Sequence, residues 1–261
     1  MSFDLFFFER RGALKTSLDV LAYFDKFVEY DEDRDYNSLE GCSDVIKELA
    51  KKMFLKFPPL NGEYAPPDEI AYASEESESH LCDYSFGKHG IYCAFSYRVD
   101  EEALAYAKRL SDESPIGIYN PQSNDALYAK GLDVLICRTE HQSDMVCDLG
   151  NIEHFLETLD DKERGTSNRD NAFLTLWFEK DGTQGPYIQC TPNYSSSGFL
   201  KALFKGRDSG EISGYFFEIE KDGALYQTLL QDKEELTKTI KDWCLERKEP
   251  DISDYQKILD L

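Results

Sequence analysis

An acidic run reading Glu-Tyr-Asp-Glu-Asp-Arg-Asp-Tyr, which ends at Tyr36, is the first part of the chain whose residues could do chemistry. Asp31, Asp33 and Asp35 match the first three ligand positions of an EF-hand calcium loop, whose carboxylates hold the ion. The match fails at two constrained positions. The sixth position requires glycine and is Tyr36, and the twelfth requires a bidentate glutamate and is Cys42. We therefore expect no calcium site in this run.

The same run could instead bind another protein. Tyr30 and Tyr36 bracket its charges, and aromatic side chains are enriched at protein interfaces. A second acidic cluster, Glu-Glu-Ser-Glu at residues 75–78, has the same character. A plain solvated loop is the alternative, because charge runs commonly lie in solvent. The candidate partner-binding residues are Tyr30, Asp31, Glu32, Asp33, Asp35, Tyr36, Glu75, Glu76 and Glu78.

Histidine and cysteine side chains gather around one short segment and could imitate a zinc site. His80, Cys82, His89 and Cys93 would converge there, but their spacing matches no closed four-ligand pattern. We expect Cys82 and Cys93 to be packed thiols on the core face of a hairpin. The seven cysteines are odd in number and scattered, which is typical of reduced, buried thiols. We expect no bound metal and no cofactor.

The common catalytic motifs are missing from the sequence. It has no Gly-x-Ser-x-Gly elbow, Cys-x-x-Cys pair, His-Glu-x-x-His helix or glycine-rich phosphate loop, and it has only four histidines. We therefore assign no catalytic residue. An enzyme that pairs two carboxylates stays open, because acidic residues are abundant and their spatial pairing is invisible in a sequence.

Charge is the most distinctive property of the composition. Among 261 residues, 51 Asp and Glu outnumber 29 Lys and Arg, which gives a formal net charge of -22. Nucleic acids and anionic lipids require basic surfaces, so we expect neither as a partner. No stretch approaches the roughly 20 apolar residues of a membrane helix, and the first apolar run is short and lacks a basic leader. We expect a cytoplasmic protein whose charged partner is basic, and nothing in the sequence indicates an oligomeric state.

The first half of the chain contains the elements that would position these residues. Phenylalanine-rich sequence predicts a strand over 4–9, and alternation predicts a hairpin over 81–97. Helical spacing predicts two helices between them, the first capped by Thr16, and a third helix after the hairpin. A short strand over 116–119 completes the set. The order is that of the split βαβ, ferredoxin-like fold with one extra helix, which we assign to residues 1–122.

For residues 125–249, the sequence predicts an antiparallel sheet with helices on one face. A break reading Asn-Pro-Gln-Ser-Asn at 120–124 is the candidate linker between two domains. An Asp-Gly pair at Asp222 predicts a hairpin turn, and Asp232 begins the last long helix. Residues 250–261 form a short acidic tail. The predicted fold class is α+β, with two subdomains.

Two segments of the chain resemble a known class of proteins. The opening, Met-Ser-Phe-Asp-Leu-Phe-Phe, resembles the starts of bacterial immunity proteins encoded beside polymorphic or type VI secreted toxins. The segment Phe-Phe-Glu-Ile-Glu-Lys-Asp-Gly at 216–223, with the capped helix after it, resembles segments of the same proteins. The resemblance implies a non-catalytic cytosolic antitoxin that binds a cognate toxin and blocks it, and it carries over no individual functional residue. The acidity fits, because nuclease toxins have basic substrate clefts that an acidic partner can occupy.

Two other classes of protein are also compatible with this sequence. An acidic hydrolase or metabolic enzyme would use scattered carboxylates in a concave site that also holds a ligand. A regulatory or scaffold module would need no such site. The immunity-protein hypothesis differs from both, because it predicts one tightly bound protein partner at one-to-one stoichiometry and no turnover of a substrate.

Overall fold

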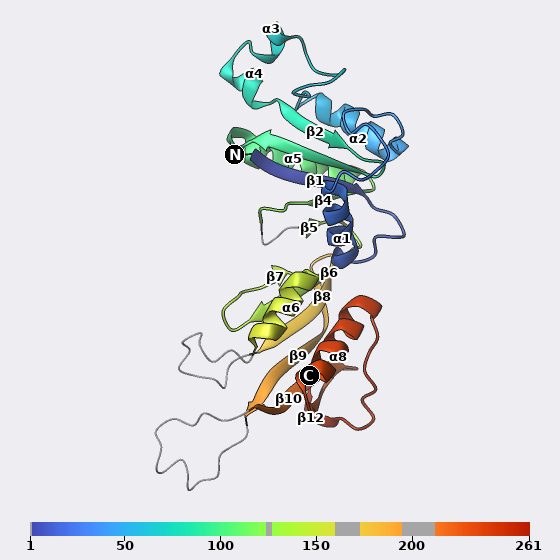
Figure 1. The fold of residues 1–261 in the computed structure, drawn as a ribbon, viewed down its shortest axis with the longest axis vertical. Coiled ribbons are helices and arrows are strands. Elements are labelled where there is room, and N and C mark those ends of the chain that lie inside the picture. Colours follow the sequence, from blue (N-terminus) through green and yellow to red (C-terminus); the bar gives the residue numbers. More distant parts are fainter. Residues whose placement is uncertain (1, 124–126, 160–172, 195–211) are drawn as a thin grey trace. The chain divides into compact units, whose positions relative to one another are not determined.

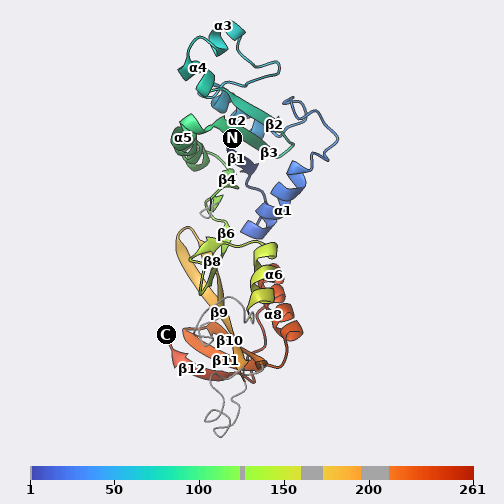
Figure 2. The ribbon, with the colours of Figure 1, turned by 60° about the vertical axis from the view of Figure 1, so that its left-hand side comes forward.

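The part of the chain that the computed structural model describes comprises residues 2–123, 127–159, 173–194 and 212–261. The chain divides into two compact units, Met1–Asp133 and Val134–Leu261 (Figure 1, Figure 2). Each unit is built on one antiparallel sheet with helices packed against it, so the predicted α+β fold class is confirmed. In the described parts of the chain, no helix is long and apolar enough to cross a membrane.

The first unit contains a five-stranded sheet with the strand order β2-β3-β1-β4-β5. Its strands are β1 (Ser2–Glu9), β2 (Cys82–Phe86), β3 (Gly90–Ser96), β4 (Ile116–Tyr119) and β5 (Leu127–Tyr128). The helices of this unit are α1 (Ser17–Val28), α2 (Asp44–Phe54), α3 (Asp68–Ala71), α4 (Glu75–Ser79), the 3-10 turn η1 (Tyr97–Val99) and α5 (Asp100–Glu113). The strands pair antiparallel, and β1 lies between β3 and β4.

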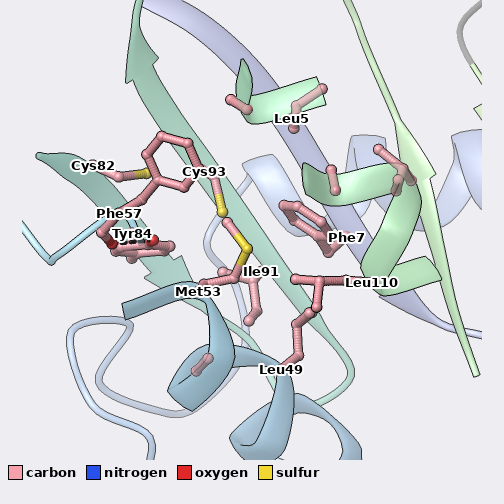
Figure 3. Close-up of a cluster of buried hydrophobic side chains, with 14 of the residues drawn as sticks. Leu5, Phe7, Leu49, Met53, Phe57, Cys82, Tyr84, Ile91, Cys93 and Leu110 are labelled. Atoms are coloured by element: carbon pink, nitrogen blue, oxygen red, sulfur yellow. Dashed lines mark hydrogen bonds between the residues drawn. The ribbon is translucent and has the colours of Figure 1, made fainter. Parts of the chain in front are cut away.

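Strand β1 buries side chains on both of its faces. Phe7 packs into a cluster with Leu49 of α2 and Leu110 of α5 (Figure 3). Phe6 faces the other way and contacts Phe27 of α1, with 4.9 Å between the ring centroids. Because successive side chains of a strand point to opposite faces, α1 covers one face of the sheet and α2 and α5 cover the other.

The predicted hairpin is confirmed as the pair β2 and β3. Tyr84 is paired with Cys93, and Phe86 is paired with Ile91. All four side chains belong to the buried cluster on the α2 and α5 face. Figure 3 shows Tyr84, Ile91 and Cys93 within it. The Tyr84 hydroxyl donates a hydrogen bond of 2.7 Å to the carbonyl of Phe57, so its one polar group is satisfied inside the core.

Three of the longer helices begin at a capping side chain, whereas α3 and α5 begin without one. Thr16 accepts a hydrogen bond from the amide of Asp19, whose carboxylate accepts one of 2.8 Å from the Thr16 amide. Ser43 caps α2 by accepting a hydrogen bond of 3.2 Å from the amide of Ile46. Asp232 caps the last helix of the second unit in the same way. These bonds satisfy amide donors that have no acceptor within the helix.

The second unit contains a seven-stranded sheet with the strand order β12-β11-β10-β9-β8-β6-β7. Its strands are β6 (Asp133–Thr139), β7 (Met145–Val146), β8 (Leu174–Lys180), β9 (Thr183–Tyr194), β10 (Ile212–Lys221), β11 (Ala224–Leu230) and β12 (Gln256–Asp260). Its described helices are α6 (Leu149–Thr158) and α8 (Lys233–Glu246). The two helices lie side by side on one face of the sheet (Figure 2), where Lys241 forms an ion pair of 2.5 Å with Glu153.

Two hairpins of this sheet use the same turn. Asp181 and Gly182 have φ values of 49° and 77°, and Asp222 and Gly223 have values of 51° and 72°. Two consecutive positive φ values match the twist of the flanking strands and favour Asp-Gly pairs. The predicted turn at Asp222 is therefore confirmed. The tetrapeptide Glu-Lys-Asp-Gly occurs twice in the sequence because both hairpins have the same turn geometry.

The chain around the predicted linker and tail takes part in the two sheets. Residues 120–123 are attached to the first sheet, because the Gln122 side chain donates to the carbonyl of Ser2 at 2.9 Å and accepts from the amide of Asp4 at 3.1 Å. The two units divide after Asp133. The segment expected to be an acidic tail contains β12, which pairs with β11 as an edge strand.

Candidate functional site

A cleft of about 910 Å³ opens in the first unit beside the acidic run that the sequence singles out. Four segments line it: the residues after β1, helix α1, the loop after α1, and the turn between β2 and β3. Its lining side chains include Arg11, Tyr23, Lys26, Asp31, Glu32, Asp33, Lys88 and His89. The cleft thus gathers charges of both signs from distant parts of the sequence.

The end of β1 and the β2–β3 turn are joined at this cleft. The amide of Glu9 donates to the carbonyl of His89 at 2.9 Å, and the Glu9 carboxylate lies 2.8 Å from Nδ1 of His89. Burial raises the pKa of Glu9, but hydrogen bonds with His89 and Ser43 outweigh it and hold that pKa below its ordinary value. Arg11 lies two residues after Glu9 in the chain. The junction between β1 and the turn therefore also places the Arg11 side chain at the cleft.

Gly87 allows the β2–β3 turn to approach α1 closely. A Cβ atom at this position would lie 2.2 Å from Cε2 of Phe27, so a larger residue would require the ring to move. The Phe27 ring is buried and also contacts the ring of Tyr36, with 5.8 Å between centroids. One aromatic side chain therefore supports the turn, the helix and the acidic loop together.

The acidic run forms a folded loop in which its two tyrosines pack together. Tyr30 has a φ of 53° and turns the chain at the end of α1, and its ring lies edge-on to that of Tyr36, 4.9 Å between centroids. The Tyr36 hydroxyl accepts a hydrogen bond of 2.9 Å from the amide of Glu32. The Tyr36 carbonyl accepts another of 2.8 Å from the amide of Phe86. Tyr36 is therefore an internal anchor of the loop, whereas Tyr30 is 50% exposed.

The carboxylates of the loop fall into two groups. Glu32 accepts a hydrogen bond of 2.8 Å from the amide of Lys88, and Asp35 accepts one of 2.9 Å from the amide two residues later. Asp31 and Asp33 are exposed, and their carboxylates form no hydrogen bond or ion pair with any described residue. The carboxylates of Asp31 and Asp33 are thus available to a partner.

Arg34 fixes the second half of the loop. Its Nη2 donates to the carbonyls of Ser38 and Glu40, both at 2.9 Å, and lies 3.0 Å from the sulfur of Cys42. Burial raises the pKa of Cys42, although the positive charge of Arg34 acts against the rise. The only basic residue of the acidic run is therefore a structural clamp that binds backbone carbonyls.

The second acidic cluster lies at the other end of the β2–β3 hairpin. Glu75, Glu76 and Glu78 belong to the short helix α4, which directly precedes β2, and Glu75 forms an ion pair of 3.3 Å with Arg98. The acidic loop instead contacts the hairpin turn. The length of β2 separates the two clusters, which at about 3.4 Å per residue is roughly 17 Å. The structure does not bring the two clusters into one pocket.

His80 and His89 also lie at opposite ends of this hairpin. Nδ1 of His80 is 2.8 Å from the carbonyl of Glu76, and its Nε2 is 3.2 Å from the carboxylate of Glu102. Within the residues that the structure describes, no group of three or more His, Cys, Asp or Glu side chains is placed to hold a metal ion. All seven cysteines are free and buried.

No protein-family model, curated protein sequence or solved structure matches this chain. Its function must therefore be inferred from the geometry and charge of the site. The sequence did not reveal Arg11, Tyr23 and Lys88 as site residues, because they belong to no motif and meet only in the folded chain. It indicated His89 only as one of four residues that could imitate a zinc site. The available signal was weak: Lys88 and His89 stand between two glycines, as expected for a tight turn.

Proposed function

We propose that this chain is a non-enzymatic bacterial immunity protein that acts in the cytoplasm, binding and blocking a cognate toxin with a basic surface, such as a nuclease. One observation carries the proposal. Asp31 and Asp33 present free carboxylates on a loop whose neighbouring residues Glu32, Arg34 and Tyr36 are held by internal bonds. A loop that is already ordered loses little entropy on binding, so its charges favour a specific contact.

The overall charge supports a basic partner. A net charge of -22 produces a field that accelerates encounter with a basic cleft and discourages nucleic acid. A toxin that acts on nucleic acid needs a basic surface for its substrate, which an acidic protein can mask. The inhibitory mechanism in this proposal is steric and electrostatic masking.

Exposed apolar side chains near both acidic clusters support a protein partner over a small ligand. Tyr30 is 50% exposed beside Asp31. Ile70 and Tyr72, which lie directly before α4, are 62% and 54% exposed. Protein interfaces combine a few aromatic and aliphatic anchors with a polar rim, and both clusters provide that combination.

We also propose that the first unit is a variant of the ferredoxin-like fold. The strand order β4-β1-β3-β2 and the position of α2 and α5 on one face support this assignment. In this reading α1 is the extra helix, on the opposite face, and β5 extends the sheet.

A carboxylate enzyme is the second candidate, and the presence of a cleft favours it. A general acid needs a carboxyl group with a raised pKa. The hydrogen bond from Lys56 instead holds the pKa of Glu102 below its ordinary value, and the pKa of Glu9, whose partner His89 lines the cleft, is also lowered. We therefore rank the enzyme second.

Affinity capture from an extract of the native host tests the proposal. The wild-type chain and an Asp31→Lys, Asp33→Lys double variant would be used in parallel. We expect one protein at one-to-one stoichiometry with the wild type, less of it with the variant, and stoichiometric inhibition of the purified partner. Recovery of no protein partner, together with turnover of a small molecule, would favour the enzyme instead.

A further inference from the structure

Three basic side chains line the cleft without a hydrogen-bonded or ion-paired partner. Arg11, Lys26 and Lys88 line it, and their side chains form no hydrogen bond or ion pair with any residue that the structure describes. This is notable in a chain with 51 acidic and 29 basic residues, where carboxylates are plentiful. Cations that stay unpaired beside a concave surface are available to a ligand.

Arg11 is held in place by an aromatic ring and not by an acid. Its guanidinium carbon lies 5.3 Å from the centroid of Tyr23. Nε of Arg11 and the hydroxyl of Tyr23 are both cut off from solvent and donate no hydrogen bond within the described parts of the chain. Burial, with the nearby charge of Glu32, raises the pKa of Tyr23, so its hydroxyl keeps the proton. Two donors at this cleft therefore lack an acceptor, which is unusual for buried polar groups.

The β2–β3 turn adds two further polar side chains to the cleft. The backbone of Lys88 is tied to Glu32 through its amide, while its side chain is exposed. Nδ1 of His89 is bound to Glu9, which leaves Nε2 without a hydrogen bond to the described residues. Both residues line the same cleft as Arg11.

The loop after α1 supplies the opposite charge. The carboxylates of Asp31, Asp33 and Glu40 line the cleft and form no hydrogen bond or ion pair with described residues. Three free carboxylates thus accompany the three free cations. A ligand with only negative charge would be repelled by the loop, and one with only positive charge would be repelled by the strand ends.

We propose that this cleft binds a small zwitterion, with its oxyanion on Arg11 and Lys88 and its ammonium group on Asp31 and Asp33. The planar guanidinium matches two oxygens of a phosphate or carboxylate. The volume of about 910 Å³ lies within the range of about 300–1,000 Å³ for small-molecule sites. This inference goes beyond the proposed function and shares with it only the two free aspartates.

Titration of the full chain, followed by NMR of its backbone amides, tests the proposal. The probe is O-phosphoethanolamine, with ethyl phosphate and ethylamine as controls that each carry one of its charges, and 4-aminobutyrate as the carboxylate analogue. We expect saturable shifts at Arg11, Lys88 and His89 with at least one zwitterion, and binding of ethyl phosphate and ethylamine about tenfold weaker or more. The tighter of the two zwitterions identifies the oxyanion of the ligand.

Two arginine substitutions form a matched pair for this test. Arg11→Gln should weaken zwitterion binding by about tenfold. Arg109→Gln should not, although Arg109 also lies over a tyrosine ring, 4.8 Å from the centroid of Tyr106 on α5. Arg11→Lys, which keeps the charge and loses the planar fork, should fall between wild type and Arg11→Gln, and serves if Arg11→Gln fails to fold.

Two results would overturn the proposal. One is the absence of saturable shifts with either zwitterion, and the other is equal affinity of the Arg11→Gln and Arg109→Gln variants. Binding of a captured protein partner by Arg11→Gln would be measured separately. If Arg11→Gln loses zwitterion binding but still binds the protein partner, the two binding activities are independent. Failure of one proposal then does not count against the other.

Discussion

The carboxylate of Glu32 accepts a hydrogen bond of 2.8 Å from the backbone amide of Lys88. This contact joins the acidic loop after α1 to the turn between β2 and β3. It holds the free carboxylates of Asp31 and Asp33 beside the cations at the strand ends. One half-buried glutamate side chain therefore links the acidic loop to the turn that carries Lys88.

Replacing Glu32 should loosen the loop and destabilise the first unit. Glu32→Ala removes a charged acceptor and leaves the Lys88 amide without a partner, so we expect a loss of about 1–3 kcal/mol in the free energy of unfolding. Asp33→Ala is the control, because its carboxylate is free, and should change the stability by less than about 0.5 kcal/mol. Urea denaturation measures both values. Unchanged hydrogen exchange at the Lys88 amide of Glu32→Ala would show that the contact does not hold the loop.

Gly87→Ala should also destabilise the chain, through overpacking. The added Cβ would lie 2.2 Å from the Phe27 ring, and we expect a cost of about 1–3 kcal/mol because a packed core resists such shifts. Gly12→Ala is the matched control, since a Cβ there would meet nothing within 4 Å. Equal stability of the two variants in thermal unfolding would contradict this close approach of the turn to α1.

Strong local patterns made part of the fold predictable. The β2–β3 hairpin follows from strict alternation at Cys82, Tyr84 and Phe86, and the start of α1 follows from the cap at Thr16. Strand β12 was missed because Gln-Lys-Ile-Leu-Asp is short and has no buried residue, so only its pairing with distant β11 makes it a strand. The cleft was missed for the same physical reason. Its residues come from four segments that only tertiary contacts bring together.

The sequence also could not distinguish the free carboxylates of the loop from those that accept a hydrogen bond. Asp31, Glu32, Asp33 and Asp35 look alike as a charge run. Their difference arises from which amide each side chain meets, and the amide that Glu32 meets belongs to Lys88, far along the chain.

Stability should depend on the ionisation of Glu9. Burial raises its pKa, but hydrogen bonds with His89 and Ser43 hold it below the ordinary value of 4.5. A carboxylate with a lowered pKa in the folded state stabilises the fold above its unfolded-state pKa, and this contribution is lost as the pH falls through the folded-state pKa. Glu9→Gln should therefore be less stable than wild type near about pH 7, and the difference should shrink below about pH 4. Urea denaturation at both pH values checks this, and a constant difference would contradict the pairing.

All seven thiols should be reduced and unreactive in the folded protein. Each cysteine is free and buried, and burial raises the pKa of Cys190 and of Cys244 to about 12. Because the thiolate is the reactive form, we expect slow reaction with a colorimetric thiol reagent in the native state. Denaturation without a reductant should release seven reactive thiols. A smaller number would reveal a disulfide.

Asp31 and Asp33 should steer a basic partner to this chain, and the association rate constant across a salt series measures that most directly. The captured partner would be tested against wild type, Asp31→Lys with Asp33→Lys, and a control with the same charge change on the second unit, Glu246→Lys with Asp254→Lys. Between about 0.05 and 0.5 M salt, the wild-type rate should fall about tenfold or more, because screening removes the attraction. At low salt the loop variant should associate about tenfold more slowly than the control, with a smaller change in dissociation. An association rate that is independent of salt, or equal in the loop variant and the control, would contradict a steering and contact role for the acidic loop.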